Sequence, residues 1–368
     1  MSAMTIKEIA KLAGVSIATV SRVINRTSFV SPAIVEKVES VIHESNFVPN
    51  FVARSLRYDN TKMIGIVISD ISNSYFNIIA KVSEDVMREK GYSMIVCSTE
   101  EDQARELNYL RLLIGRKVDG IILNSTGKND DFIAEFSRIL PIVLINRRVV
   151  NSSFLGDFID SSNQVGAALM VDHLYSKGHR KIGLLNGDLH LSTGRERFEG
   201  FVDAMGQHGI IVDDQYPYRY DGHFHIDGGY RGAERLYELP EPPTAMVIMN
   251  NAMGIGALKY FKAKGVKVPE QISLVVYGDI FNSDILYIEP DHVTLSPYVI
   301  GKKAADFILE RTTAPDIRNR EVIYMPSFVE GNSVSELAAE PGPNPDPEIM
   351  AVYSGADPAL FAGVADKS

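Results

Sequence analysis

The chain has 368 residues and a formal net charge of −10, and 45% of its residues are hydrophobic and 23% charged. This composition is typical of a globular protein too long for one ordinary core, so two or three folded units are expected. No apolar run approaches the roughly 20 residues that span a bilayer, and the N-terminus lacks a secretory signal, so we expect a cytoplasmic protein without membrane contact. The single cysteine, Cys97, excludes an internal disulfide.

The negative charge is unevenly distributed along the chain. Residues 1–60 hold seven basic and five acidic side chains, so the excess of acidic residues lies in the remainder. Because charge is informative for each domain rather than for the whole chain, the N-terminal segment is compatible with a nucleic-acid partner.

Three short amphipathic helices are predicted in this N-terminal segment. Thr5 and Glu8 form a capping box ahead of apolar residues at helical spacing. Ser16 is the expected N-cap of a second helix, and Ser31 with Pro32 begins a third helix that carries a stripe of valines and isoleucines. Two helices joined by a short turn and supported by a third follow the helix-turn-helix plan.

The second predicted helix has an unusual outer face, which carries Ile17, Ala18, Ser21, Arg22 and Asn25. Apolar side chains on such a face suit thymine methyl groups in a major groove, and an arginine can pair bidentately with guanine. Spacing alone leaves a small helical domain without a DNA function as the alternative.

The segment from Thr5 to Leu56 resembles, almost without interruption, the N-terminal signature of the lactose/galactose-repressor (LacI/GalR) family. The matching stretches are TIKEIAKLAGVSIATVSRVIN, FVSPAIVEKVES and FVPNFVARSL. The resemblance implies a sequence-specific DNA-binding transcriptional repressor that binds double-stranded operator DNA as a homodimer. It implies base contacts from Ile17, Ala18 and Arg22, and mainly phosphate contacts from Thr5, Ser16, Thr19, Ser21 and Asn25.

Residues 50–57 (NFVARSLR) match the hinge helix of this family. Eight residues are too few for a stable free helix, so we expect this segment to order only when two copies pack together on DNA. The family pattern implies DNA contacts from Asn50, Ala53 and Leu56, with both Leu56 side chains entering the minor groove and kinking the duplex. An ordinary apolar linker residue is the alternative interpretation of Leu56.

From Met63 onward, runs rich in valine, isoleucine and leucine alternate with amphipathic helical runs, and the series restarts near residue 163. This alternation predicts an α/β sensor of two doubly wound parallel-sheet subdomains with a ligand cleft between them. A weaker resemblance over residues 64–334 implies the periplasmic-binding-protein-like fold with three crossovers. It assigns residues 62–160 and 293–320 to one half, and residues 161–292 with a final strand at 321–325 to the other.

These observations predict four segments. We expect a helix-turn-helix DNA-binding domain at residues 1–49, a hinge helix and linker at 50–61, and an effector-binding and dimerisation domain at 62–335. Residues 336–368 are Pro-rich and acidic and lack a heptad pattern, so we expect a disordered tail rather than a coiled coil.

The candidate effector-binding residues stand mainly at strand ends and follow the family pattern. They are Ser69, Asn73, Tyr75, Phe76, Asp160, Thr193, Arg197, Phe224, Asn250 and Asp279. Arg197 could clamp paired hydroxyls or a carboxylate, while Tyr75 and Phe224 could supply flat walls. A solvated arginine is the alternative interpretation of Arg197.

Two departures from the family pattern bear on the effector. The chain has Asn250-Asn251 where the family usually has Asn-Asp, and Tyr277-Gly278 where it usually has an aromatic residue followed by Asp. Two frequent carboxylates are therefore missing, although the neighbouring Asp279 could compensate for the second. The effector classes left open are a sugar, a sugar acid and a sugar phosphate, and the missing carboxylates favour an anion.

Two other classes of protein were weighed. The α/β segment has no Walker loop, no GxGxxG after its first strand, no GxSxG and no HExxH, so an enzyme is not supported and no cofactor is expected. His223 and His225 flanked by aspartates could suggest a metal, but a solvated loop is the more ordinary interpretation and no metal is expected. A secreted binding protein of the same fold is disfavoured by the fused DNA-binding segment.

Overall fold

The computed structural model describes residues 4–25, 28–45, 61–294, 296–314 and 317–337. The chain divides into two compact units, residues 1–61 and residues 62–368, and each is described by itself. The predicted hinge helix at 50–57 and almost all of the predicted tail lie outside the described residues.

The N-terminal unit contains α1 (Ile6–Ala13), α2 (Ile17–Asn25) and α3 (Pro32–Glu44). Their apolar stripes meet in one small core around Ile9, Val20 and Val38, each of which is fully buried. α1 and α2 begin at the capping residues that the sequence predicts. Both bonds of the Thr5 and Glu8 capping box form, and the Ser16 hydroxyl accepts from the backbone N–H of Thr19 at 3.1 Å. Ser31 stands at the N-cap of α3, but its side chain makes no capping hydrogen bond.

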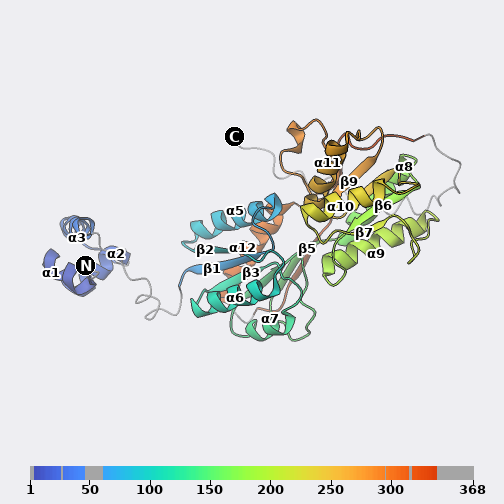
Figure 1. Ribbon diagram of the computed structural model, residues 1–368. Coiled ribbons are helices and arrows are strands. Elements are labelled where there is room, and N and C mark those ends of the chain that lie inside the picture. The colour runs from blue at the N-terminus through green and yellow to red at the C-terminus, as the bar shows by residue number, and fades with distance from the viewer. Residues whose placement is uncertain (1–3, 26–27, 46–60, 295, 315–316, 338–368) are drawn as a thin grey trace, which may run out of the picture. The chain divides into compact units, whose positions relative to one another are not determined.

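The larger unit consists of two six-stranded sheets (Figure 1). The first sheet has the order β11-β5-β4-β3-β1-β2, with β1 (Met63–Ile68), β2 (Ser93–Ser98), β3 (Gly120–Leu123), β4 (Ile142–Ile145), β5 (Asp157–Ser161) and β11 (Glu321–Tyr324). The second has the order β12-β10-β9-β8-β6-β7, with β6 (Ile182–Asn186), β7 (Arg219–Asp221), β8 (Ala245–Ile248), β9 (Ser273–Tyr277), β10 (Asp291–Thr294) and β12 (Ser327–Val329). Neighbouring strands are parallel except for the antiparallel pair β10 and β12.

Helices cover both sheets, as the buried apolar strands require. Around the first sheet, α5 packs against α12 on one face and α6 and α7 lie on the other (Figure 1); their bounds are α5 (Ser74–Glu89), α6 (Gln103–Gly115), α7 (Asp130–Phe136) and α12 (Pro297–Thr313). Around the second sheet, α8 packs against α9 and α10 against α11, with bounds α8 (Asn163–Ser176), α9 (Ser192–Gln207), α10 (Ile226–Tyr237) and α11 (Asn251–Lys264). Among the described residues, one 3₁₀ turn, η1, spans Ser283–Ile285. No helix within the described residues is long and apolar enough to cross a membrane.

The prediction for the last strand was wrong. Residues 321–325 were expected in the second half, but β11 pairs with β5 of the first sheet. The chain then crosses over, and β12 pairs with β10 of the second sheet. Both strands are short and lie at sheet edges, so their apolar pattern alone carries no information on which sheet they join.

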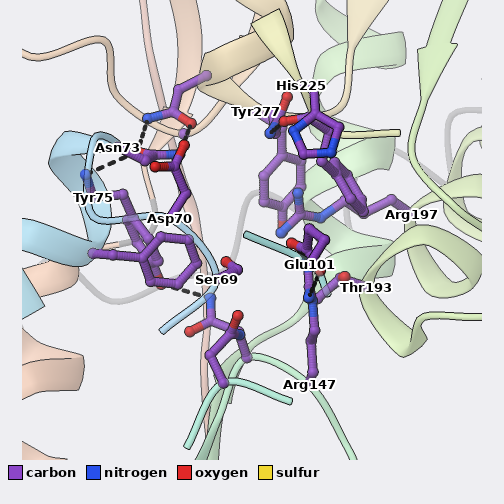
Figure 2. Close-up of a pocket in the computed structure, with 17 residues that line it drawn as sticks. Ser69, Asp70, Asn73, Tyr75, Glu101, Arg147, Thr193, Arg197, His225 and Tyr277 are labelled. Carbon is purple, nitrogen blue, oxygen red and sulfur yellow. Dashed lines mark hydrogen bonds and ion pairs between the residues drawn. The ribbon is translucent and has the colours of Figure 1, made fainter. Parts of the chain in front are cut away.

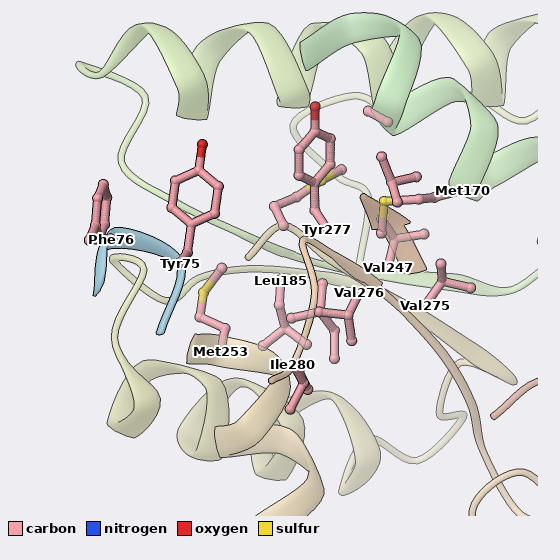
Figure 3. Close-up of a cluster of buried hydrophobic side chains, with 14 of the residues drawn as sticks. Tyr75, Phe76, Met170, Leu185, Val247, Met253, Val275, Val276, Tyr277 and Ile280 are labelled. Carbon is pink, nitrogen blue, oxygen red and sulfur yellow. The ribbon is translucent and has the colours of Figure 1, made fainter. Parts of the chain in front are cut away.

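The two subdomains share one hydrophobic core at their junction (Figure 3). Tyr75 and Phe76 at the start of α5 belong to the same buried cluster as Met253 of α11 and Tyr277 at the end of β9. This cluster fixes the carboxyl ends of β1 and β9 relative to each other. The polar residues that follow these strands consequently face a common space.

Candidate DNA-binding helix and effector pocket

The outer face of α2 exposes the side chains that a major-groove reader needs. Ile17 is 45% exposed, and Ala18 and Arg22 are also exposed, whereas Val20 on the opposite face is fully buried. An exposed isoleucine beside an arginine is unfavourable for a merely solvated helix, and it matches the apolar and bidentate contacts that base edges offer.

The predicted phosphate-contacting residues lie at the start of α1 and along α2. Thr5 is exposed and its hydroxyl donates to Glu8 Oε2 at 2.8 Å. The hydroxyls of Ser16 and Thr19 are 2.9 Å apart and hydrogen-bond to each other. Ser21 is half-buried. Asn25 is the last residue of α2, but its side chain lies outside the described residues, as do Asn50, Ala53 and Leu56.

In the larger unit, a pocket with an empty volume of about 640 Å³, its open mouth included, lies between the carboxyl ends of the two sheets (Figure 2). The first subdomain contributes Ser69, Asp70, Asn73, Tyr75, Phe76, Glu101, Asn124, Asn146 and Arg147. The second contributes Thr193, Arg197, Phe224, His225, Asn250, Asn251, Tyr277 and Gly278.

Eight of the ten candidate effector-binding residues line this pocket, and Asp160 and Asp279 do not. Asp160 lines a separate groove together with Arg148 and Glu196. The Asp279 carboxylate accepts hydrogen bonds from His292 Nε2 at 3.0 Å and from the Thr294 hydroxyl at 3.1 Å. Because this side chain is committed to those partners, it does not replace the carboxylate that Gly278 lacks.

The list of candidate residues omitted nine lining residues: Asp70, Glu101, Asn124, Asn146, Arg147, His225, Asn251, Tyr277 and Gly278. Of these, Asn251 and Gly278 had been considered only as positions that lack the carboxylates of the family pattern. For two of the others a signal was present. Asn124 and Asn146 each directly follow a buried apolar strand, β3 and β4, where parallel sheets present ligand-binding groups. Glu101 is separated from the end of β2 by a longer turn, so its position in the sequence gave no such signal.

Arg197 is buried at 4% exposure and is oriented by the second subdomain. Its Nε donates to Asn163 Oδ1 at 2.8 Å and its Nη1 to the Met249 carbonyl at 2.5 Å. The guanidinium lies 3.8 Å from the centroid of the Tyr277 ring. These contacts use two of the three guanidinium nitrogens and fix the plane of the group, as Figure 2 shows for the Arg197 and Tyr277 side chains.

A second buried arginine in the pocket is neutralised by an acid. Arg147 Nη1 and Nη2 donate to the two carboxylate oxygens of Glu101 at 2.7 and 2.8 Å. Such a bidentate pair satisfies both charges. Counting Asp70 as well, the lining holds two carboxylates and two guanidiniums, so the pocket has no strong excess of either charge.

Two buried acceptors in the pocket have no partner among the described residues. They are the side-chain carbonyl oxygens of Asn124 and Asn146. Asn124 Nδ2 donates to the Ile145 carbonyl at 3.2 Å, and this acceptor fixes the orientation of the Asn124 amide. Asn146 Nδ2 donates to the Tyr75 hydroxyl at 2.7 Å. Burial raises the pKa of Tyr75, so the hydroxyl that accepts this bond stays neutral. Buried acceptors without a partner are groups that a ligand or water with hydrogen-bond donors would satisfy.

Phe224 and Asn250 support each other at the pocket wall. Phe224 adopts a left-handed backbone with φ 61°. Its carbonyl accepts from Asn250 Nδ2 at 2.9 Å, and Asn250 Oδ1 caps α11 by accepting from the Met253 N–H at 2.8 Å. Both the nitrogen and the oxygen of the Asn250 amide are therefore bonded within the protein. The neighbouring His223 hydrogen-bonds to Asp188, and the described residues hold no group of three potential metal ligands.

Two family models match the chain. "Periplasmic binding proteins and sugar binding domain of LacI family" covers residues 61–326, and "Bacterial regulatory proteins, lacI family" covers residues 5–50. The chain belongs to the LacI family. Family membership makes it a DNA-binding transcriptional regulator rather than an enzyme.

Curated relatives and solved structures agree with this membership. The HTH-type transcriptional repressor PurR of Haemophilus influenzae (strain PittEE) is 36% identical over 316 residues, which cover 85% of this chain and 92% of the relative. PurR of Mannheimia succiniciproducens is 32% identical over 337 residues, covering 91% and 99%. A lac repressor dimer bound to operator and the anti-inducer ONPF superposes with a TM-score of 0.76 at 25% identity, covering 91% of this chain and 100% of that one.

Proposed function

We propose that this protein represses transcription as a cytoplasmic homodimer that inserts α2 of each protomer into successive major grooves of a pseudo-palindromic operator. The exposed Ile17, Ala18 and Arg22 support this role for α2. One helix of nine residues reads only a few base pairs, so two-fold symmetry is needed for specificity. The lac repressor that resembles this chain is described as a dimer on operator.

The segment boundaries belong to the same proposal. Residues 1–49 form the DNA-binding domain, 50–61 the hinge helix and linker, 62–335 the effector-binding and dimerisation domain, and 336–368 the tail. Asn50, Ala53 and Leu56 contact DNA from the hinge. The division of the chain near residue 61 is consistent with this arrangement.

A small polar effector occupies the pocket between the two sheets and controls operator affinity. The observation that supports its chemistry is the pair of side-chain carbonyl oxygens of Asn124 and Asn146, which are buried without a partner among the described residues and would accept hydrogen bonds from donors on the effector. The aromatic side chains of Tyr75, Phe224 and Tyr277 offer flat surfaces for a ring. An effector that combines these features is a neutral ring compound with several hydroxyl or N–H groups, such as a sugar or a nitrogen heterocycle.

An anionic effector, which the missing carboxylates had favoured, is less well supported by this pocket. Asp70 and Glu101 restore negative charge to the lining, and Arg147 is already paired with Glu101. Arg197 is the guanidinium in the lining that has no carboxylate partner, and two of its nitrogens are bound to the protein. Burying an anion whose nearest guanidinium already donates to protein groups would cost several kcal/mol of binding free energy.

Isothermal titration calorimetry on the full chain tests the effector class. Neutral sugars and planar heterocycles are compared with hexuronates and sugar phosphates, and the titration is repeated with an operator obtained by in vitro selection. We expect tight binding only in the neutral group, weakened about tenfold or more by Asn124→Ala and unaffected by Asn77→Ala on the exposed face of α5.

Coupling between effector and operator must be reciprocal, because both ligands act on one thermodynamic cycle. We expect the operator to change the effector affinity by the same factor as the effector changes the operator affinity. Tight binding of anions alone would contradict the proposed effector class. An effector affinity indifferent to operator would contradict its regulatory role.

A further inference from the structure

Asn73 and Asn251 join the two subdomains of the larger unit by a reciprocal amide pair. Asn73 follows β1 of the first sheet, and Asn251 begins α11 after β8 of the second sheet. Asn73 Nδ2 donates to Asn251 Oδ1 at 3.0 Å, and Asn251 Nδ2 donates to Asn73 Oδ1 at 2.9 Å. Figure 2 shows Asn73 with these bonds at the edge of the pocket. The partners are 178 positions apart, so only the packing of one subdomain on the other brings them together.

Further contacts fix the orientation of both amides. Asn73 Oδ1 also accepts from the Tyr75 N–H at 3.0 Å and caps α5, so the oxygen must occupy that place and the Nδ2 must face Asn251. Asn251 is 6% exposed, and its Nδ2 also donates to the Asp279 carbonyl at 3.3 Å. Each amide is therefore held in one orientation, and the two are complementary.

We propose that Asn73 and Asn251 form a latch that holds the cleft closed before an effector binds. Both residues line the pocket, so their pair ties the two walls of the cleft together, and the subdomains can separate at this point only when both hydrogen bonds break. This inference rests on the proposed role of the pocket as the effector site. Asn73 and Asn251 are positioning residues, because they act on the two subdomains.

The latch requires an uncharged amide at both positions. An aspartate at 251 would accept from Asn73 Nδ2 with one oxygen and place its other oxygen against Asn73 Oδ1 and the Asp279 carbonyl, so that three acceptors would meet with no donor between them. The same change would not harm α11, since an acidic residue in a first helical turn is favourable. An aspartate at 73 would likewise keep the cap of α5 while losing the donor to Asn251. Both substitutions therefore separate the latch from local helix stability.

Amide hydrogen exchange of the full chain without effector, followed by mass spectrometry, tests the latch. The variants are Asn251→Asp and Asn73→Asp, and the matched control is Asn77→Asp, which adds the same charge at an exposed position of α5. We expect residues 69–76 and 249–254 to exchange about tenfold faster in both latch variants, as the loss of a hydrogen bond predicts. The control should exchange at the wild-type rate.

A double substitution distinguishes a shared contact from two separate effects. In an Asn251→Ala background the pair is already broken, so Asn73→Asp should add no further increase in exchange. Additive effects, or wild-type exchange in both latch variants, would overturn the proposal. If one aspartate variant fails to fold, the alanine background and the remaining variant still decide the question. Because no effector is present, a failure here leaves the effector assignment untouched.

Discussion

Asp157 and Asp160 lie on the same strand, β5, and their carboxyl pKa values are displaced in opposite directions. Burial acts to raise the pKa of Asp157, but hydrogen bonds from Arg311 and Arg320 outweigh it and hold this pKa below its usual value. Burial raises the pKa of Asp160 to about 7, because its nearest donors, the Ser161 N–H and Asn163 Nδ2, are neutral. β5 thus carries one carboxylate, Asp157, that two arginines keep ionised, and one carboxyl group, Asp160, whose pKa is about 7.

Replacing Asp157 by Asn should destabilise the larger unit by about 3–5 kcal/mol, because the buried Arg311 would lose the carboxylate that accepts from its Nε and Nη2 at 2.7 Å each. Urea denaturation followed by circular dichroism measures the change. Glu310→Gln is the control, since its pair with Arg320 is at the surface and should contribute less than about 1 kcal/mol. A loss no larger than that of the control would refute the structural role of the buried pair.

The acid stability of the protein should depend on the same carboxylate. The unfolded Asp157 titrates near pH 3.9 and the folded one lower, so its contribution is present above about pH 4 and is lost as the pH falls through the folded pKa. Denaturation midpoints of the wild type should therefore fall on acidification below about pH 4. Asp157→Asn should fall less steeply in that range, and identical acid profiles would argue against the depressed pKa.

Asp160 should give the opposite pH dependence. Between about pH 4 and about pH 7 the unfolded carboxyl group is ionised and the folded one is protonated, so the free energy of unfolding falls as the pH rises. Asp160→Asn should remove this slope, which in the wild type should amount to a few kcal/mol over the window, to order of magnitude. The test compares denaturation midpoints at pH 4, 5.5 and 7 in both proteins. A wild-type slope retained in the variant would exclude Asp160 as its origin.

Arg22→Ala should weaken binding to a selected operator by about 1–3 kcal/mol and relax the base preference at one position, because the exposed guanidinium of α2 is proposed to pair with one guanine. Fluorescence anisotropy on the operator, on single-base variants and on unrelated duplexes measures both effects. An equal loss on every duplex would instead assign Arg22 to a phosphate.

Arg197→Lys should weaken binding of the effector found by calorimetry by at least about tenfold, because a single ammonium lacks the planar fork that bonds Asn163 and Met249 while stacking on Tyr277. Operator affinity without effector should stay near that of the wild type. Arg195→Lys on the same helix is the matched control, since its side chain is 44% exposed. Equal effects of the two substitutions would show that Arg197 has no special role in the pocket.

The sequence by itself determined the DNA-binding helix and the alternation of the α/β unit. Capping residues and apolar spacing act within one or two helical turns, so the exposed face of α2 and its buried Val20 follow from neighbouring residues alone. Runs of buried apolar residues similarly identify strands such as β1, β8 and β9, because each is covered on both faces.

Only the tertiary structure decided which polar groups line the pocket. Asn124, Asn146 and Arg147 converge because β4, β3 and β1 are consecutive neighbours in the first sheet, and this order cannot be read from the sequence of any one strand. Asp279 was expected in the pocket, yet its carboxylate is bound by His292 and Thr294 of a neighbouring strand. The short strand β11 was assigned to the wrong sheet for a related reason. The spacing of residues within one helix or strand determines which of its faces is buried. Contacts between residues of different strands depend instead on how the strands are ordered and how the two subdomains pack.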